Sequence, residues 1–172
     1  MDTVSRLRSC SLTDVRTYAL AAAFITGNMA LPQLVHLMPQ GGLIWLPIYF
    51  FTLVGAYGFG RGVGLMTAVL SPVLNHLLFG MPGEGALAGI LVKSVFLAVI
   101  ASEVARRRGR VSVAAIVCVV AGYQLAGGAV ESLVARDLSA GLQDLRLGLP
   151  GIMVQVAGGY AVLRWLENRS RV

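Results

Sequence analysis

The chain has 172 residues, of which 56% are hydrophobic and 13% are charged, and its formal net charge is +6. Its mean hydropathy of +0.76 lies far outside the range of water-soluble domains. These values exclude a soluble enzyme or binding module. They indicate an integral membrane protein in which residues 1–172 form a single transmembrane domain.

Uncharged segments long enough to cross a bilayer follow one another along the chain. No Asp, Glu, Lys or Arg lies between Arg16 and Arg61, and about 20 helical residues cross a hydrocarbon core of roughly 30 Å. The turn sequence MPQGG at residues 38–42 divides this segment into two helices. The segments lack the period-two alternation of barrel strands. The sequence therefore predicts an all-α integral membrane protein, a single bundle of six transmembrane helices near residues 17–37, 43–58, 62–80, 86–105, 111–131 and 147–166.

Basic residues are concentrated on one predicted side of the membrane. Cytoplasmic segments of membrane proteins carry an excess of Lys and Arg, so both termini are predicted to be cytoplasmic. This topology and contact with anionic lipid account for the positive net charge, and no nucleic-acid partner is expected. The predicted cytoplasmic residues are Arg6, Arg8, Arg16, Arg61, Arg106, Arg107, Arg108, Arg110, Arg164, Arg169 and Arg171.

Polar residues of several predicted helices fall at similar depths in the outer half of the membrane. Lys93 lies roughly 10 Å below the outer boundary at a rise of 1.5 Å per residue, and Gln155 lies about 12 Å below it. We expect these residues to share a substrate pocket. The predicted substrate-binding residues are Lys93, Asn75, His76, Tyr123, Gln124, Glu131 and Gln155.

Lys93 admits two interpretations. A lysine facing lipid at this depth costs about 2.5–3.5 kcal/mol, so it is expected to face the bundle interior, a partner or a wet cavity. It would then meet an anionic group of the ligand. The alternatives are a structural ion pair with Glu131 or Glu84, or extension of its stem to the outer surface. For the amides, interhelical hydrogen bonding is the corresponding alternative.

Small residues recur every four positions in the first predicted helix, at Ala19, Ala23 and Gly27. This spacing permits close approach of another helix. It predicts either a docking face for a partner or packing within the bundle.

The segment LPIYFFTLVGAYGFGRGVGLMTAVLSPVLNHLLFGMP, together with the pair Ala19-x-x-x-Ala23, resembles the substrate-binding S component of energy-coupling factor (ECF) transporters. The resemblance covers most of the chain and is strongest over residues 17–105. It implies capture of a vitamin or related small micronutrient on the outer side of a bacterial or archaeal cytoplasmic membrane. It also implies that Ala19 and Ala23 dock on a T component carried by two cytoplasmic ATPases.

A capture subunit of this kind needs a gate but no catalytic group. The loop of Pro39, Gln40, Gly41 and Gly42 is predicted to close the pocket, because its glycines and proline suit a gate. The chain contains no G-x-x-x-x-G-K-[ST] loop, so ATP is expected to be used by the partners. No cofactor and no resident metal are expected.

Two other functions remain open from the sequence. One is a small intramembrane enzyme that uses His76, Glu84 or Glu131 as an acid or base. The chain contains no H-E-x-x-H or G-x-S-x-G motif, so no enzymatic activity is expected. The other is a structural membrane subunit in which Lys93 forms an interhelical ion pair.

Overall fold

The computed structural model describes residues 13–169, and every regular element in that range is helical. The expectation of an all-α fold is therefore confirmed for this part of the chain. The elements are α2 (Val15–Val35), α3 (Gly41–Trp45), the 3-10 helix η1 (Pro47–Tyr49), α4 (Phe50–Phe59), α5 (Arg61–Phe79), α6 (Glu84–Arg108), α7 (Val113–Ala135), α8 (Leu138–Leu147) and α9 (Leu149–Arg169).

Four of these helices, α2, α5, α6 and α7, are long and apolar enough to cross a membrane. Helix α9 has the same length as α2 but contains Gln155, Arg164 and Glu167, and it is not among the four. Within residues 13–169, length and composition thus support a multi-pass membrane protein with four candidate spans, whereas six were expected.

The helix predicted near residues 43–58 is divided into α3, η1 and α4, and the apolar part from Pro47 to Phe59 is shorter than a full span. The division occurs at Leu46, whose φ of 46° and ψ of 46° are left-handed. Pro47 disfavours the right-handed helical conformation at the residue before it and has no N–H to donate. The prediction of a single helix near residues 43–58 was therefore wrong.

Helix α4 lies at the centre of the bundle, where it contacts α2, α5, α6 and α9. Its residues from Thr52 to Gly58 are all buried, as expected for a helix that is apolar on every side. The contact with α5 is close, because a Cβ on Gly64 would lie 2.5 Å from the Cβ of Ala56. The short α4 is thus a core element around which the longer helices pack.

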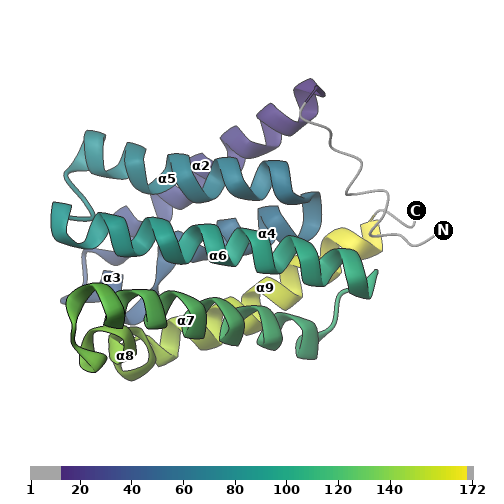
Figure 1. The fold of residues 1–172 in the computed structure, drawn as a ribbon. Helices are drawn as coiled ribbons and strands as arrows, with labels where there is room; N and C mark the ends of the chain where they lie inside the picture. Colours follow the sequence, from purple (N-terminus) through teal and green to yellow (C-terminus); the bar gives the residue numbers. More distant parts are fainter. Residues whose placement is uncertain (1–12, 170–172) are drawn as a thin grey trace.

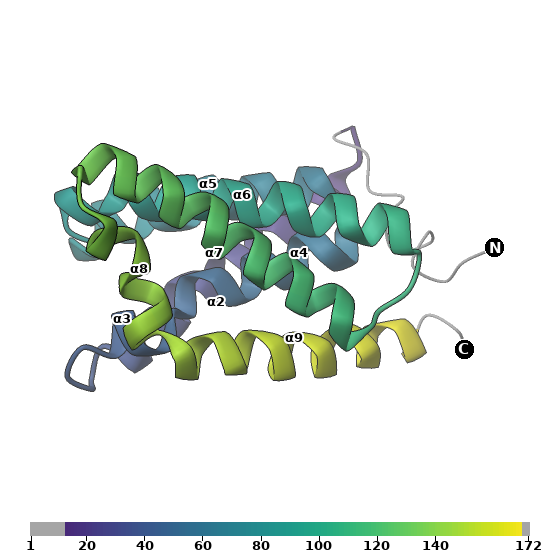
Figure 2. The same ribbon diagram turned by 60° about the horizontal axis from the view of Figure 1, so that its bottom comes forward.

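The long helices run between two ends of the molecule (Figures 1 and 2). One end, which we call the Arg-rich end, contains the start of α2, the end of α9 and the connection between α6 and α7. The opposite end, which we call the α8 end, carries α3, α8 and the α5–α6 connection. The described basic residues at the Arg-rich end are Arg16, Arg61, Arg106, Arg107, Arg108, Arg110, Arg164 and Arg169. Three further predicted cytoplasmic residues, Arg6, Arg8 and Arg171, lie outside the described range.

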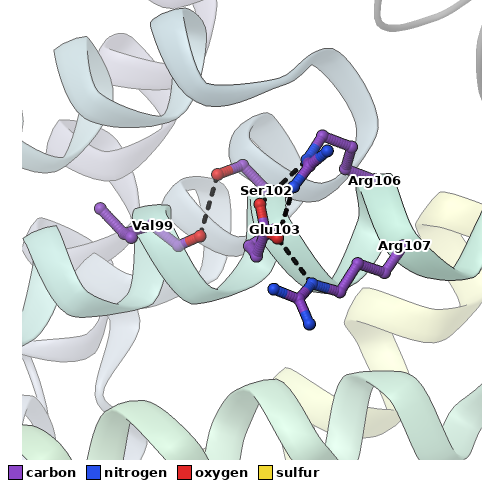
Figure 3. A network of polar contacts seen from close by, with 5 residues as sticks. All are labelled: Val99, Ser102, Glu103, Arg106 and Arg107. Atoms are coloured by element: carbon purple, nitrogen blue, oxygen red, sulfur yellow. Dashed lines mark hydrogen bonds and ion pairs between the residues drawn. The ribbon is translucent and has the colours of Figure 1, made fainter.

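Two of these arginines pair with a glutamate in the last turns of α6 (Figure 3). The Glu103 carboxylate accepts hydrogen bonds from Arg106 Nε at 3.0 Å, from Arg106 Nη2 at 2.7 Å and from Arg107 Nε at 2.6 Å. All three side chains are at least one third exposed. Exposed pairs of this kind contribute little to stability, so Glu103 is a suitable control position for charge substitutions.

Helix α8 was not predicted, because four charged residues within residues 132–146 made this segment resemble a loop. Its N-cap is Asp137, which accepts hydrogen bonds from Ser139 N at 2.8 Å and Ser139 Oγ at 2.5 Å. These bonds lower the pKa of Asp137 below its usual value. Helix α8 packs on α7 at a glycine contact, where a Cβ on Gly141 would lie 2.1 Å from Gly128 O. This contact holds α8 against the end of α7.

Candidate functional site

A cavity of about 620 Å³ lies at the α8 end of the bundle. Its wall is formed by residues of α2, α3, η1, α5, α6, α7 and α8 and of the loops between them. The lining residues are Pro32, His36, Leu37, Met38, Pro39, Gln40, Gly41, Gly42, Leu43, Leu46, Pro47, Ile48, Tyr49, Asn75, Met81, Pro82, Ala86, Ile90, Lys93, Glu131, Gln143 and Asp144.

Lys93 of α6 is the central charged group of this wall, and its side chain is 2% exposed. Its Nζ lies 2.5 Å from Glu131 Oε2 of α7 and 2.8 Å from Asp144 Oδ2 of α8. The Glu131 side chain is 31% exposed and that of Asp144 is 11% exposed. Three helices therefore contribute one ion triad, and its carboxylates are its more accessible members.

Glycines allow α6 and α7 to come close enough for this triad to form. A Cβ on Gly127 of α7 would lie 2.3 Å from Lys93 Cγ, so the lysine stem runs directly against the α7 backbone. A Cβ on Gly89 of α6 would lie 2.5 Å from Glu131 Oε1. Any larger residue at either position would have to displace one member of the triad.

The triad contains one of the two ion pairs that the sequence left open for Lys93. Glu131 was a named alternative partner, whereas Asp144 was not, because its position depends on the unpredicted α8. Glu84, the other named partner, is exposed at the start of α6. Lys93 thus faces the bundle interior and lines the cavity, and its charge is already balanced by carboxylates.

Asn75 of α5 is the third predicted binding residue in the cavity wall, after Lys93 and Glu131. Its side chain is buried, and Nδ2 donates a hydrogen bond of 2.9 Å to Asn28 O. Because a carbonyl oxygen only accepts, the amide nitrogen must face Asn28, which fixes the orientation of the amide. The opposite atom, Asn75 Oδ1, has no hydrogen-bond partner in the protein. Asn75 thus contributes to the cavity wall and keeps one buried carbonyl oxygen without a hydrogen-bond donor.

Tyr123, Gln124 and Gln155 form a separate cluster, which the structure does not bring into the cavity wall. Tyr123 Oη donates to Gln155 Oε1 at 2.8 Å and accepts from Gln124 Nε2 at 3.1 Å. The ring of Tyr49, which lines the cavity, packs on that of Tyr123 with centroids 5.4 Å apart. The two amides are thus joined through the Tyr123 hydroxyl, which corresponds to the interhelical alternative, and Gln155 Nε2 is left without a hydrogen-bond partner in the protein.

The residues of the predicted gating loop all line the cavity. Gln40 has a positive φ of 54°. A Cβ on Gly41 would lie 2.1 Å from Val35 O, so this tight loop requires glycine there. Nearby, His36 Nδ1 lies 2.7 Å from Pro32 O. Pro39, Gln40, Gly41 and Gly42 therefore form part of the cavity wall.

His76 does not line the cavity, although its neighbour in α5, Asn75, does. Its Nδ1 is 2.7 Å from Pro82 O, and Pro82 itself lines the cavity. His76 thus holds the α5–α6 loop. Within residues 13–169, no three His, Cys, Asp or Glu side chains are grouped as a metal site.

The three small residues of α2 divide into two groups. Ala19 and Ala23 are exposed on the surface of the bundle. Gly27 is half-buried, and a Cβ at this position would lie 2.8 Å from Phe51 Cε2. Gly27 therefore serves packing within the bundle, whereas the alanine pair is open to a partner or to lipid.

These features were compared with known proteins. No family model, curated protein or solved structure matches this chain. The site therefore has to be interpreted from its own geometry.

Proposed function

We propose that this chain is the membrane-embedded substrate-capture subunit of an ECF-type importer in a bacterial or archaeal cytoplasmic membrane. The observation that carries this proposal is the cavity of about 620 Å³ at one end of a bundle of apolar helices. This volume suits a ligand of the size of a vitamin or a related micronutrient. The cavity wall includes polar side chains of α5, α6, α7 and α8 and a tight glycine-containing loop, as capture and closure require.

The proposed topology has six spans. Helices α2, α5, α6 and α7 supply four of them, and α9 and the α3–η1–α4 unit supply the other two. In this proposal the Arg-rich end and both termini are cytoplasmic, and the arginines at that end support this orientation through the positive-inside rule. The cavity at the α8 end then opens to the outside, from which a nutrient would arrive.

The proposed partners are a T component and two cytoplasmic ATPases. Ala19 and Ala23 offer an exposed face on α2 where another helix can approach closely. The chain contributes binding and the partners contribute ATP hydrolysis. No observation favours the enzymatic alternative: of His76, Glu84 and Glu131, only Glu131 lines the cavity.

Native mass spectrometry of the gently purified protein tests the capture function. We expect a small organic molecule to be retained in stoichiometric amount by the parent protein. The Ala86→Trp variant should lose it, because Ala86 lines the cavity and a tryptophan there fills it. The matched control is Ala88→Trp on the same helix, since Ala88 is exposed and does not line the cavity. A parent protein without a retained molecule, or equal retention in both variants, would contradict the proposal.

A further inference from the structure

The net charge of the ionised side chains in the cavity wall is not positive. Lys93 contributes one positive charge, and Glu131 and Asp144 contribute two negative charges, so the ionised triad has a net charge of −1. Protonation of one carboxyl group would bring the sum to zero. In neither state does Lys93 present an uncompensated positive charge to a ligand, and an anionic ligand would have to displace a carboxylate from it.

Most of the free hydrogen-bonding capacity of the triad is also on the acceptor side, since Lys93 keeps one N–H while each carboxylate keeps a whole oxygen. Lys93 has three N–H groups, and two of them are directed at Glu131 Oε2 and Asp144 Oδ2. Each carboxylate has a second oxygen, Oε1 or Oδ1, that remains as a further acceptor. Because the Glu131 side chain is 31% exposed, its carboxylate is the most accessible charged group of the three.

Asn75 adds an independent observation on another helix. Asn75 lines the cavity, and its Oδ1 is buried and has no hydrogen-bond partner in the protein. An unsatisfied buried carbonyl is costly unless a donor reaches it. Asn75 Oδ1 therefore needs a hydrogen-bond donor, and the carboxylates of the triad can accept from one as well.

We infer that the cavity selects a small organic molecule by a positively charged, N–H-donating nitrogen group, which would bind between Glu131 and Asn75. The body of the ligand would lie against the apolar part of the wall, formed by Leu46, Ile48, Tyr49 and Ile90. This assignment of a ligand class rests on the capture function proposed above. It replaces the anionic group expected from the sequence, which required an unpaired Lys93.

Three probes that share one ring system and differ in charge test this inference. Tryptamine is cationic at neutral pH, tryptophol is neutral and indole-3-acetate is anionic. Binding of each to the purified full chain in lipid nanodiscs is measured by equilibrium dialysis up to millimolar concentrations. We expect tryptamine to bind about tenfold or more tightly than tryptophol, a difference typical of one charge-assisted contact. Indole-3-acetate should bind most weakly.

Two variants change the charge at the cavity in opposite directions. Glu131→Gln removes the accessible negative charge and should abolish the preference for tryptamine over tryptophol. Gln143→Glu adds a negative charge at an exposed lining position and should strengthen tryptamine binding severalfold. The matched control is Glu103→Gln at the other end of α6. It changes the net charge of the protein by the same amount as Glu131→Gln and should leave the order of affinities for the three probes unchanged. Because Gln143 is exposed, its variant gives a result even if Glu131→Gln fails to fold.

Equal binding of the three probes, absence of binding by all of them, or a preference for indole-3-acetate would overturn the inferred ligand class. The capture function is decided separately by the molecule that the protein retains on purification. A retained anionic molecule would leave capture intact and overturn the cationic class. Preference for tryptamine without a retained molecule or uptake would support the recognition chemistry and contradict the capture function.

Discussion

At Lys93, the cost of burying a charge in an apolar bundle is offset by two carboxylates from different helices. Such a triad is not a large net source of stability, because desolvation of the ions opposes their attraction. Removal of one member is costly, however, since it leaves the others buried without a counter-charge. The triad therefore ties α6, α7 and α8 together mainly by making their separation unfavourable.

The Lys93→Met variant tests this role. It keeps the length and apolar stem of the side chain but leaves Glu131 and Asp144 facing each other without a cation. We expect the free energy of unfolding to fall by about 3 kcal/mol, as for other buried pairs that lose one partner. Unfolding in mixed micelles of increasing denaturing-detergent content measures it. Glu103→Gln, at the exposed cluster of Figure 3, should leave the midpoint nearly unchanged, and an equal effect of both variants would contradict a special role for the triad.

Some of this site could be predicted from the sequence at the level of single residues. The apolar surroundings of Lys93 required an interior position, and Glu131 was among its possible partners. The depth calculation was insufficient for Gln124 and Gln155, because it gives height in the bilayer and not the direction around the helix axis. Their amides do not line the cavity and are instead bonded to Tyr123.

At the scale of elements, α8 determines whether the site is complete. It supplies Asp144 and the lining residue Gln143, although its charged residues made residues 132–146 resemble a loop. Two signals in the sequence indicate the helix: Asp137 suits an N-cap, and apolar residues recur at helical spacing at Leu138, Leu142 and Leu145. A short amphipathic helix of this kind contains charged residues and therefore does not stand out as an uncharged segment.

Gly141→Ala should loosen this element. The new Cβ would lie 2.1 Å from both Gly128 O and Ser132 Oγ, so α8 must move away from α7 and carry Asp144 away from Lys93. We expect a loss of about 1–3 kcal/mol in stability, the usual range for overpacking, and faster amide hydrogen exchange within α8. Gly85→Ala is the glycine control, because nothing lies within 4 Å of its Cβ position. Unchanged exchange in α8 would show that the glycine contact does not hold it.

At the scale of the whole molecule, the two ends of the bundle differ in charge. The Arg-rich end has an excess of cations, whereas the α8 end contains the cavity and acidic residues such as Glu84, Glu131, Asp137 and Asp144. The charge pattern of the sequence indicates this polarity. It does not indicate that α4 is a short core helix, because a fully buried helix and a membrane span are both apolar on every side.

The exposed alanine pair of α2 allows the proposed docking on a T component to be tested separately from ligand binding. If Ala19 and Ala23 meet a partner helix, Ala19→Leu with Ala23→Leu should reduce nutrient uptake by cells at least about tenfold, because the added side chains prevent close helix approach. Retention of the ligand by the purified subunit should be unchanged, since both residues lie on the surface and away from the cavity.

The matched control for this test is a second exposed alanine pair with the same spacing, Ala157 and Ala161 on α9. Ala157→Leu with Ala161→Leu adds the same apolar volume to another face of the bundle, so it should leave both uptake and ligand retention unchanged. If the two double variants lost uptake equally, the effect would come from added volume on the surface in general and not from a docking face on α2. Normal uptake with the α2 pair substituted would exclude α2 as the docking face and leave the alanines as lipid-facing residues.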